Sequence, residues 1–262
     1  MNITKLTKHF ICFLLLLTGI LPAKAQIFRI NTINCKLSNA DTALLNKMGR
    51  FEANFYNQVF KTTRNDTVTI DINLYGKKRE FNDLQNGATA NATFADGYYM
   101  PAKNKIFIYK TDNYMRTLFH ESSHNLLRYN YTNPPKWLNE GIATLLGYLV
   151  ETTDNRILYM PQAGIVKMVK DSIRARTFNL NNFFKTPNSD WYIKKKADML
   201  YATSYCIIYF LINQDKDYLA PILVLMQKGY STDRAIKEAF GSLNNFAEEF
   251  YDFYLRGAGI KI

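Results

Sequence analysis

The spacing of hydrophobic residues in the first part of the chain switches between two repeats. A period of two over residues 68–74 is the spacing of a strand with one buried face. A spacing of three and four over residues 41–60 is typical of an amphipathic helix, and Ser38 or Asn39 can cap it. Taken together, these patterns predict strands at residues 27–33, 67–75, 92–100 and 105–109 and helices at residues 41–60 and 77–84.

Beyond about residue 110 the helical spacing dominates. Helices are predicted at residues 113–129, 134–150, 164–173, 197–212, 218–227, 233–240 and 244–255. Strands followed by helices predict an α+β fold. We expect a single domain over residues 26–262, with a small, mostly antiparallel sheet in a lobe of residues 26–110 and a helical lobe of residues 111–262.

The N-terminus has the pattern of an export signal. Lys5 and Lys8 precede an apolar run over residues 10–21, and residues 23–25 (Ala-Lys-Ala) form a cleavage site of small residues. We therefore expect residues 1–25 to be a signal peptide cleaved after Ala25, and the protein to be periplasmic or secreted. The run is too short to span a bilayer, although an uncleaved anchor is the alternative.

Composition and charge restrict the classes of function. Without the three lysines of residues 1–25, 30 basic and 22 acidic residues remain, a formal net charge of +8. The basic residues are scattered, apart from short clusters at residues 77–79 and 194–196, and no nucleic-acid motif accompanies them, so we expect no nucleic-acid partner. Two cysteines remain, Cys35 and Cys206; an exported protein can pair them, but Cys206 lies in an apolar helix, where free cysteine is common.

One short motif carries chemistry. His120 and His124, separated by Glu121, Ser122 and Ser123, lie four residues apart in a predicted helix, so both imidazoles can bind one ion. Glu121 would lie beside that ion, where it can accept a proton from a water. Apart from His9, these are the only histidines in the chain. The alternative is a pair of solvated surface histidines.

A third ligand is needed, because two histidines and a water do not complete a tetrahedral zinc site. No histidine remains, so this ligand is a downstream carboxylate or cysteine. Glu140 is the only charged residue between Lys136 and Glu151, in a helix that is apolar on nearly every side. A buried carboxylate requires a cation or a proton. We therefore predict Zn²⁺ held by His120, His124 and Glu140; the alternative is a simple ion pair with Lys136.

The motif and the helix that follows it resemble a known family. His-Glu-x-x-His followed by Trp-Leu-Asn-Glu-Gly-Ile-Ala at residues 137–143 resembles the gluzincins, the thermolysin-like zinc peptidases, and in this helix the membrane alanyl aminopeptidase family. The shorter gap between His124 and Glu140 is closer to the peptidase MA-like domains of bacteria. The resemblance extends over about residues 92–256. It implies a thermolysin-like architecture and a zinc-dependent peptidase that acts on a peptide or protein.

The resemblance also suggests further site residues. The aminopeptidase branch stabilises the oxyanion with a tyrosine of a later helix, which favours Tyr201 here, with Tyr205 as the second choice; both can instead be core aromatics. The Gly-x-Met-Glu-Asn stretch that binds the substrate's amino end in that branch is missing, and residues 92–100 take its place as a substrate-pairing edge strand. We therefore expect an endopeptidase rather than an aminopeptidase. The alternatives are an exported zinc-containing protein without turnover and a basic, aromatic-rich binding module.

Overall fold

The computed structural model describes residues 27–88, 96–214 and 217–256, so the predicted signal peptide and its cleavage site lie outside the described residues. The fold is α+β, with helices far outweighing strands. The helices are α1 (Asn39–Phe60), α2 (Lys78–Ala88), α3 (Tyr114–Asn130), α4 (Lys136–Leu146), α5 (Ala163–Arg174), α6 (Leu180–Phe183), α7 (Lys194–Ile212), α8 (Leu219–Gln227), α9 (Thr232–Phe240) and α10 (Leu243–Arg256). The strands are β1 (Phe28–Ile33), β2 (Ile70–Tyr75), β3 (Gly97–Met100), β4 (Lys105–Tyr109), β5 (Leu149–Glu151) and β6 (Ile157–Tyr159).

The main sheet is mixed, with strand order β1-β2-β4-β3. The pairs β1–β2 and β2–β4 are parallel, and only β3–β4 is antiparallel. The prediction of a mostly antiparallel sheet is therefore wrong. Helix α1 connects β1 to β2, and α2 follows β2, and a chain that passes through a helix returns to the sheet in the same direction. Within the main sheet, only β3 and β4 are joined by the short turn that an antiparallel pair permits.

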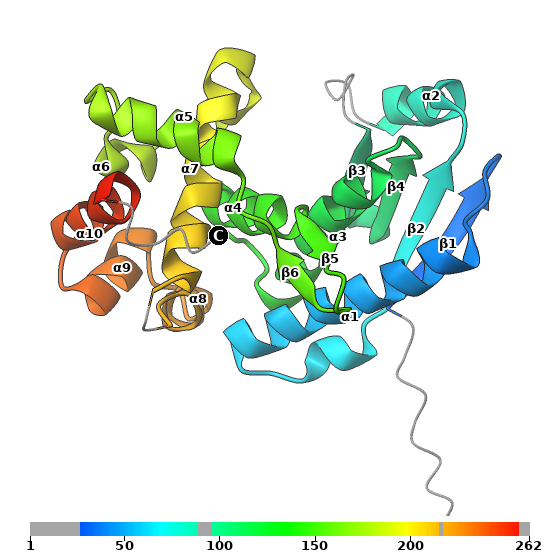
Figure 1. The fold of residues 1–262 in the computed structure, drawn as a ribbon, viewed down its shortest axis with the longest axis horizontal. Coiled ribbons are helices and arrows are strands. Elements are labelled where there is room, and N and C mark those ends of the chain that lie inside the picture. Colours follow the sequence, from blue (N-terminus) through cyan, green and yellow to red (C-terminus); the bar gives the residue numbers. More distant parts are fainter. Residues whose placement is uncertain (1–26, 89–95, 215–216, 257–262) are drawn as a thin grey trace, which may run out of the picture.

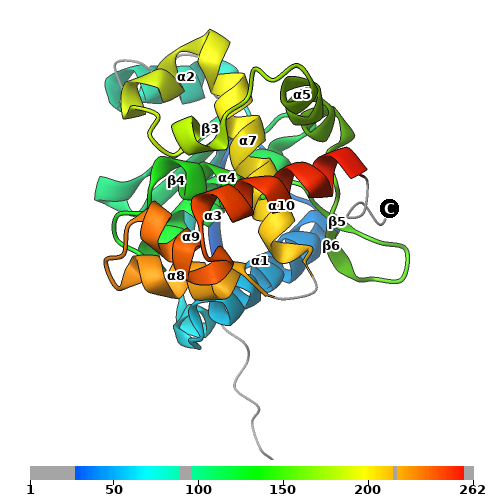
Figure 2. The ribbon, with the colours of Figure 1, turned by 90° about the vertical axis from the view of Figure 1, so that its left-hand side faces the viewer.

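Two helices occupy the centre of the molecule. Figure 1 shows the main sheet on one side, α5–α10 on the other, and α3 and α4 between them. Helix α4 packs against both α3 and α7, and Figure 2 shows α7 crossing behind α10. Every residue of α4 from Trp137 to Leu146 is buried except Asn139. Gly141 makes the contact with α7 possible, because a Cβ there would lie 2.6 Å from the backbone oxygen of Ser204.

The long predicted helices are confirmed to within a few residues, but α4 ends earlier than predicted. It stops at Leu146, and residues 149–151 form β5, which pairs antiparallel with β6. The sequence predicts a helix that continues to Val150. A short apolar run such as residues 145–150 fits a buried helix and a strand equally well, so its sequence does not separate the two.

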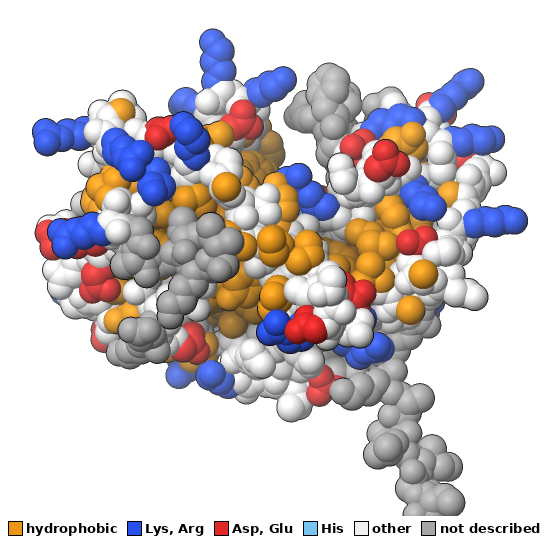
Figure 3. Space-filling view, in the orientation of Figure 1, with side chains coloured by type: hydrophobic (Ala, Val, Ile, Leu, Met, Phe, Trp, Pro, Cys, Tyr) orange, Lys and Arg blue, Asp and Glu red, His pale blue; other side chains and the backbone are white. Residues whose placement is uncertain are grey.

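The positions of Lys and Arg on the surface agree with the scattered basic residues of the sequence. On the face shown in Figure 3, Lys and Arg side chains project around the outline and hydrophobic side chains gather nearer the centre. Cys35 and Cys206 are both free thiols, so the pairing left open by the sequence is not formed in this structure. Among the described helices, none combines the length and apolar character that crossing a membrane requires.

A carboxyl group is buried where α1 meets α3. Glu52 is 0% exposed; Ser122 Oγ donates a 2.5 Å hydrogen bond to its Oε2, and its Oε1 has no hydrogen-bond partner. Burial raises the pKa of Glu52 well above its ordinary value of 4.5, which the bond from Ser122 only partly offsets. A carboxyl group in this setting stays protonated, because no cation of the described residues compensates its charge.

The protonation of Glu52 predicts a pH dependence of stability. Between the pKa of the unfolded chain, near 4.5, and the raised pKa of the folded state, only the folded state keeps this proton. The free energy of unfolding should therefore fall as pH rises through this window, by up to about 1.4 kcal/mol per pH unit. Glu52→Gln should remove this slope, as measured by urea unfolding between pH 5 and 9. The control variant Glu248→Gln, at an exposed position on α10, should show the same slope as the wild type. If the free energy of unfolding of Glu52→Gln falls with pH as steeply as that of the wild type, the prediction is wrong.

Candidate metal centre

The structure brings together three side chains that can hold a metal ion. His120 and His124 project from α3, and Glu140 projects from the facing helix α4. Glu140 Oε2 lies 3.5 Å from His120 Nε2 and 3.6 Å from His124 Nε2. The three ligand atoms all lie within 4.8 Å of one another. The two imidazoles, from adjacent turns of α3, and the Glu140 carboxylate, from α4, thus direct their ligand atoms to one point.

Glu140 is engaged on one oxygen only. Its side chain is 3% exposed, and Lys136 Nζ donates a 2.8 Å hydrogen bond to Oε1. Oε2 is buried and has no hydrogen-bond partner within the part of the chain that the structure describes. Lys136 therefore pairs with one oxygen, as the ion-pair alternative expects, and the other oxygen faces the two imidazoles, where a metal ion could bind. Burial alone would raise the pKa of Glu140, but the nearby His124, His120 and Lys136 outweigh it and lower that pKa, so the group is a carboxylate.

The donor set fits a divalent metal. Ligands about 2.0–2.1 Å from a tetrahedral zinc ion lie roughly 3.3–3.5 Å apart, close to the two carboxylate–imidazole distances observed. A buried carboxylate oxygen without a partner is costly in free energy, and a cation between it and the imidazoles would remove that cost. His120, His124 and Glu140 can therefore hold a metal ion.

A neighbouring amide orients one of the imidazoles. His124 Nδ1 lies 3.0 Å from Asn139 Oδ1. The amide oxygen is an acceptor, so Nδ1 carries the hydrogen and Nε2 is left as the free lone-pair nitrogen that faces Glu140. Sequence reasoning missed this role of Asn139. The sequence did contain a signal for this role: besides Glu140, Asn139 is a strongly polar residue within the apolar part of α4, and it directly precedes Glu140.

Loss of the Asn139 contact should weaken metal binding. Asn139→Ala removes the acceptor that fixes the His124 tautomer, and such changes typically lower metal affinity about 10- to 100-fold. Zinc affinity can be measured by competition with a fluorescent chelator. Asn139→Asp keeps an acceptor oxygen and should retain wild-type affinity. An alanine variant with unchanged affinity would show that the contact has no part in metal binding.

Glu121 lies beside the three ligands and is fixed by the edge strand β3. Its Oε2 accepts a 2.9 Å hydrogen bond from the backbone N–H of Tyr99. Burial and the charge of Glu140 raise the pKa of Glu121, while His124 and the Tyr99 N–H partly lower it. A carboxylate with a raised pKa is a stronger base, which suits proton transfer. Sequence reasoning did not identify the Tyr99 bond, because it joins residues 22 positions apart.

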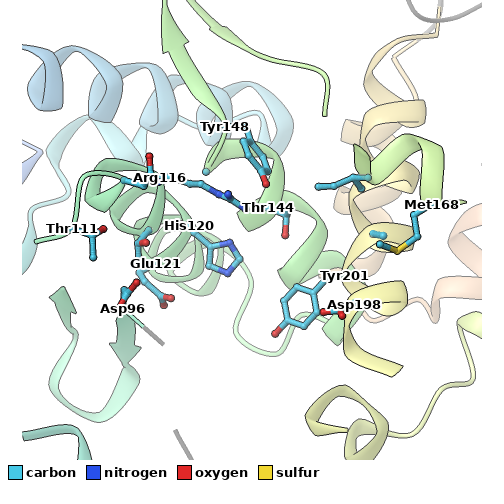
Figure 4. A pocket seen from close by; sticks show the side chains of 16 residues that line it. Asp96, Thr111, Arg116, His120, Glu121, Thr144, Tyr148, Met168, Asp198 and Tyr201 are labelled. Carbon is cyan, nitrogen blue, oxygen red and sulfur yellow. The ribbon is translucent and has the colours of Figure 1, made fainter. Parts of the chain in front are cut away.

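The two candidate tyrosines of α7 lie in different surroundings. Tyr201 lines a cavity of about 650 Å³ together with His120 and Glu121. Figure 4 shows its hydroxyl pointing from α7 toward the wall that carries these two residues. Tyr205 is fully buried, and its hydroxyl accepts a hydrogen bond from the backbone N–H of Gln162. Burial, and then the charges of Glu140 and Glu121, raise the pKa of Tyr201, which keeps its phenol protonated.

A second cavity, of about 530 Å³, lies on the other side of the ligands. It is lined by His124 and Glu140, whereas the first cavity is lined by His120. Strand β3 contributes to both, since Gly97 lines the first and Tyr99 the second. The candidate metal centre therefore lies between two cavities that share one edge strand.

Comparisons with protein-family models, with curated proteins and with solved structures gave no match to this chain.

Proposed function

We propose that the protein is an exported zinc-dependent metallopeptidase of the gluzincin type, more suited to internal peptide bonds than to chain ends. The observation that carries this proposal is the unpartnered, buried Glu140 Oε2 facing two imidazole nitrogens at 3.5 and 3.6 Å, with Glu121 beside them. The proposal extends the coarser finding that these residues can hold a metal ion. It also rests on the resemblance of residues 120–143 to the gluzincin motifs.

Zinc is the metal we propose for His120, His124 and Glu140. Two imidazoles and one carboxylate are a ligand set of catalytic zinc sites, which keep a fourth position for water or substrate. A zinc ion bound there would supply Lewis acidity, lowering the pKa of a water and polarising a carbonyl group.

The chain's own residues would carry the proton and stabilise the developing charge. Glu121 would accept the proton of the attacking water and return it to the leaving amine, and its raised pKa suits both transfers. Tyr201, protonated and across the cavity from Glu121, would donate a hydrogen bond to the oxyanion. No covalent acyl-enzyme is required.

The edge strand and the two cavities support an extended substrate. Strand β3 lies at the edge of the sheet, and the Asp96 carbonyl accepts a hydrogen bond from the Tyr109 N–H of β4, so the backbone polar groups of Gly97 and Tyr99 point away from β4. The Tyr99 N–H is bonded to Glu121, which leaves the Tyr99 carbonyl and the Gly97 backbone for a substrate. An extended peptide can pair with such an edge without its sequence being read. A cavity on each side of the ligands suits a chain that continues in both directions, which favours an endopeptidase.

Zinc analysis combined with cleavage of a mixed peptide library tests the proposal. We expect about one zinc per chain, cleavage within peptides, loss of cleavage when a chelator removes the metal, and recovery when zinc is added back. Zinc without cleavage of any peptide would instead favour a zinc-containing binding protein without turnover. A chain that binds no zinc would overturn both.

A further inference from the structure

The cavity beside His124 carries an excess of positive charge. Its charged lining residues are Arg128, Lys136 and Glu140, besides His124. Lys136 is bonded to Glu140 Oε1, and Glu140 Oε2 faces the two imidazoles rather than the cavity's cations. The two cations therefore face a cavity whose single acid serves the candidate metal centre.

Arg128 is the cation that remains available. It follows His124 by four residues on α3, so the two side chains lie on the same face of the helix. The side chain is exposed, and no described carboxylate forms an ion pair with it. It lies near the phenol of Tyr99, whose pKa is raised by burial and partly lowered by the charge of Arg128. An exposed guanidinium with no acidic partner, at a cavity beside a metal centre, can form a forked pair with a carboxylate.

The rest of this cavity also offers hydrogen-bond donors. Lys136 keeps donors beyond its bond to Glu140, and its Nζ lies 5.6 Å from the centroid of the Tyr192 ring. Tyr192 is 79% exposed and forms part of the wall, so its hydroxyl can bond to a ligand. Thr132 and Asn133 add a hydroxyl and an amide. Such a lining suits an anionic group rather than a cationic or apolar one.

The cavity on the His120 side differs in charge. Arg116 precedes His120 by four residues, mirroring Arg128, but this cavity also contains Asp96, Asp198 and Glu121. The guanidinium of Arg116 lies 4.0 Å from the centroid of the Tyr148 ring. Acids outnumber cations there, so the excess of positive charge is confined to the His124 side.

Resting on the peptidase function proposed above, we propose that the cavity beside His124 is a substrate subsite for a peptide carboxylate, with Arg128 as the specificity-determining residue. The carboxylate can belong to an Asp or Glu side chain or to the C-terminus of the peptide. The subsite selects acidic peptides and disfavours a free amino group or a Lys side chain at the same position.

Binding to an inactive variant tests the subsite. The zinc-loaded full chain with Glu121→Gln is titrated into fluorescent peptides, and anisotropy gives the Kd. A Glu-containing peptide with an amidated C-terminus should bind about tenfold more tightly than its Gln counterpart, because a charge-assisted pair is formed. A Gln peptide with a free C-terminus, compared with its amide, tests the other source of the carboxylate. A preference for the charged peptide in either comparison supports the proposal and identifies the source.

The variant Arg128→Gln should abolish this preference, and Arg128→Lys should restore part of it. Arg174→Gln, on α5 and lining neither cavity, removes the same charge and should leave the preference unchanged. Circular dichroism and zinc content verify that each variant folds. Equal affinity for charged and neutral peptides, or a preference that survives Arg128→Gln, would overturn the subsite. Cleavage by the wild type decides the peptidase proposal separately: a preference without any cleavage leaves a carboxylate-binding site, and cleavage without preference removes only the subsite.

Discussion

Replacing Glu121 by glutamine is expected to leave about one zinc ion per chain and to lower kcat/KM for peptide cleavage by roughly 10³-fold. Glutamine has nearly the same shape, and its amide oxygen can still accept the hydrogen bond from the Tyr99 N–H. It cannot accept a proton from water at neutral pH. Since Glu121 is not one of the three grouped ligands, the metal site should be unchanged.

The measurement needs zinc content and cleavage rate on the same preparation. Glu151→Gln is a matched control, because Glu151 pairs with Lys47 on the surface and lines neither cavity. It should retain wild-type activity. A Glu121→Gln variant that keeps its zinc and cleaves at the wild-type rate would exclude Glu121 as the base. A variant that loses its zinc would show that Glu121 supports the metal site instead.

Local spacing predicted the candidate metal centre well. His120 and His124 share a helix face because they are four residues apart, which is a property of the sequence alone. Glu140 was found from a conflict between a charged residue and an apolar helix. The structure places its free oxygen at the two imidazoles, 3.5 and 3.6 Å away. The partners of these residues, Asn139 for His124 and Tyr99 for Glu121, depend on how elements pack, and sequence reasoning did not identify them.

Helices were predicted better than strand pairing, again because local features can be found in the sequence and contacts between distant segments cannot. The helices were located because their periodicity is local, and Ser38, one of the two expected capping residues, caps α1. Strand direction was wrong because it depends on pairing between distant segments, although the helices between β1, β2 and β4 carried the relevant signal. The hairpin of β5 and β6 was missed, since strands of three residues leave almost no repeat to detect. The thermolysin-like architecture remains a prediction.

The two tyrosines of α7 offer a decisive comparison within one helix. Tyr201→Phe is expected to lower kcat by about 10²- to 10³-fold with little change in KM, because an oxyanion donor acts mainly in the transition state. Tyr205→Phe is expected to leave kcat within a few-fold. It should instead lower the free energy of unfolding by about 1 kcal/mol, because the Gln162 N–H loses its acceptor. Steady-state kinetics gives kcat and KM, and urea unfolding gives the free energy of unfolding, for each of the two variants.

The opposite effects follow from where each hydroxyl lies. Tyr201 faces a cavity with His120 and Glu121, close to Glu140, so its hydroxyl can meet a substrate there. Its ring keeps its contact with Trp191 after the change to Phe. The hydroxyl of Tyr205 already accepts a hydrogen bond from the Gln162 N–H, away from the cavity. If both variants lose stability and keep their activity, Tyr201 is a packing residue and another group must donate to the oxyanion. If Tyr205→Phe alone loses activity, the second choice from the sequence is the donor, and its bond to Gln162 would have to break when substrate binds.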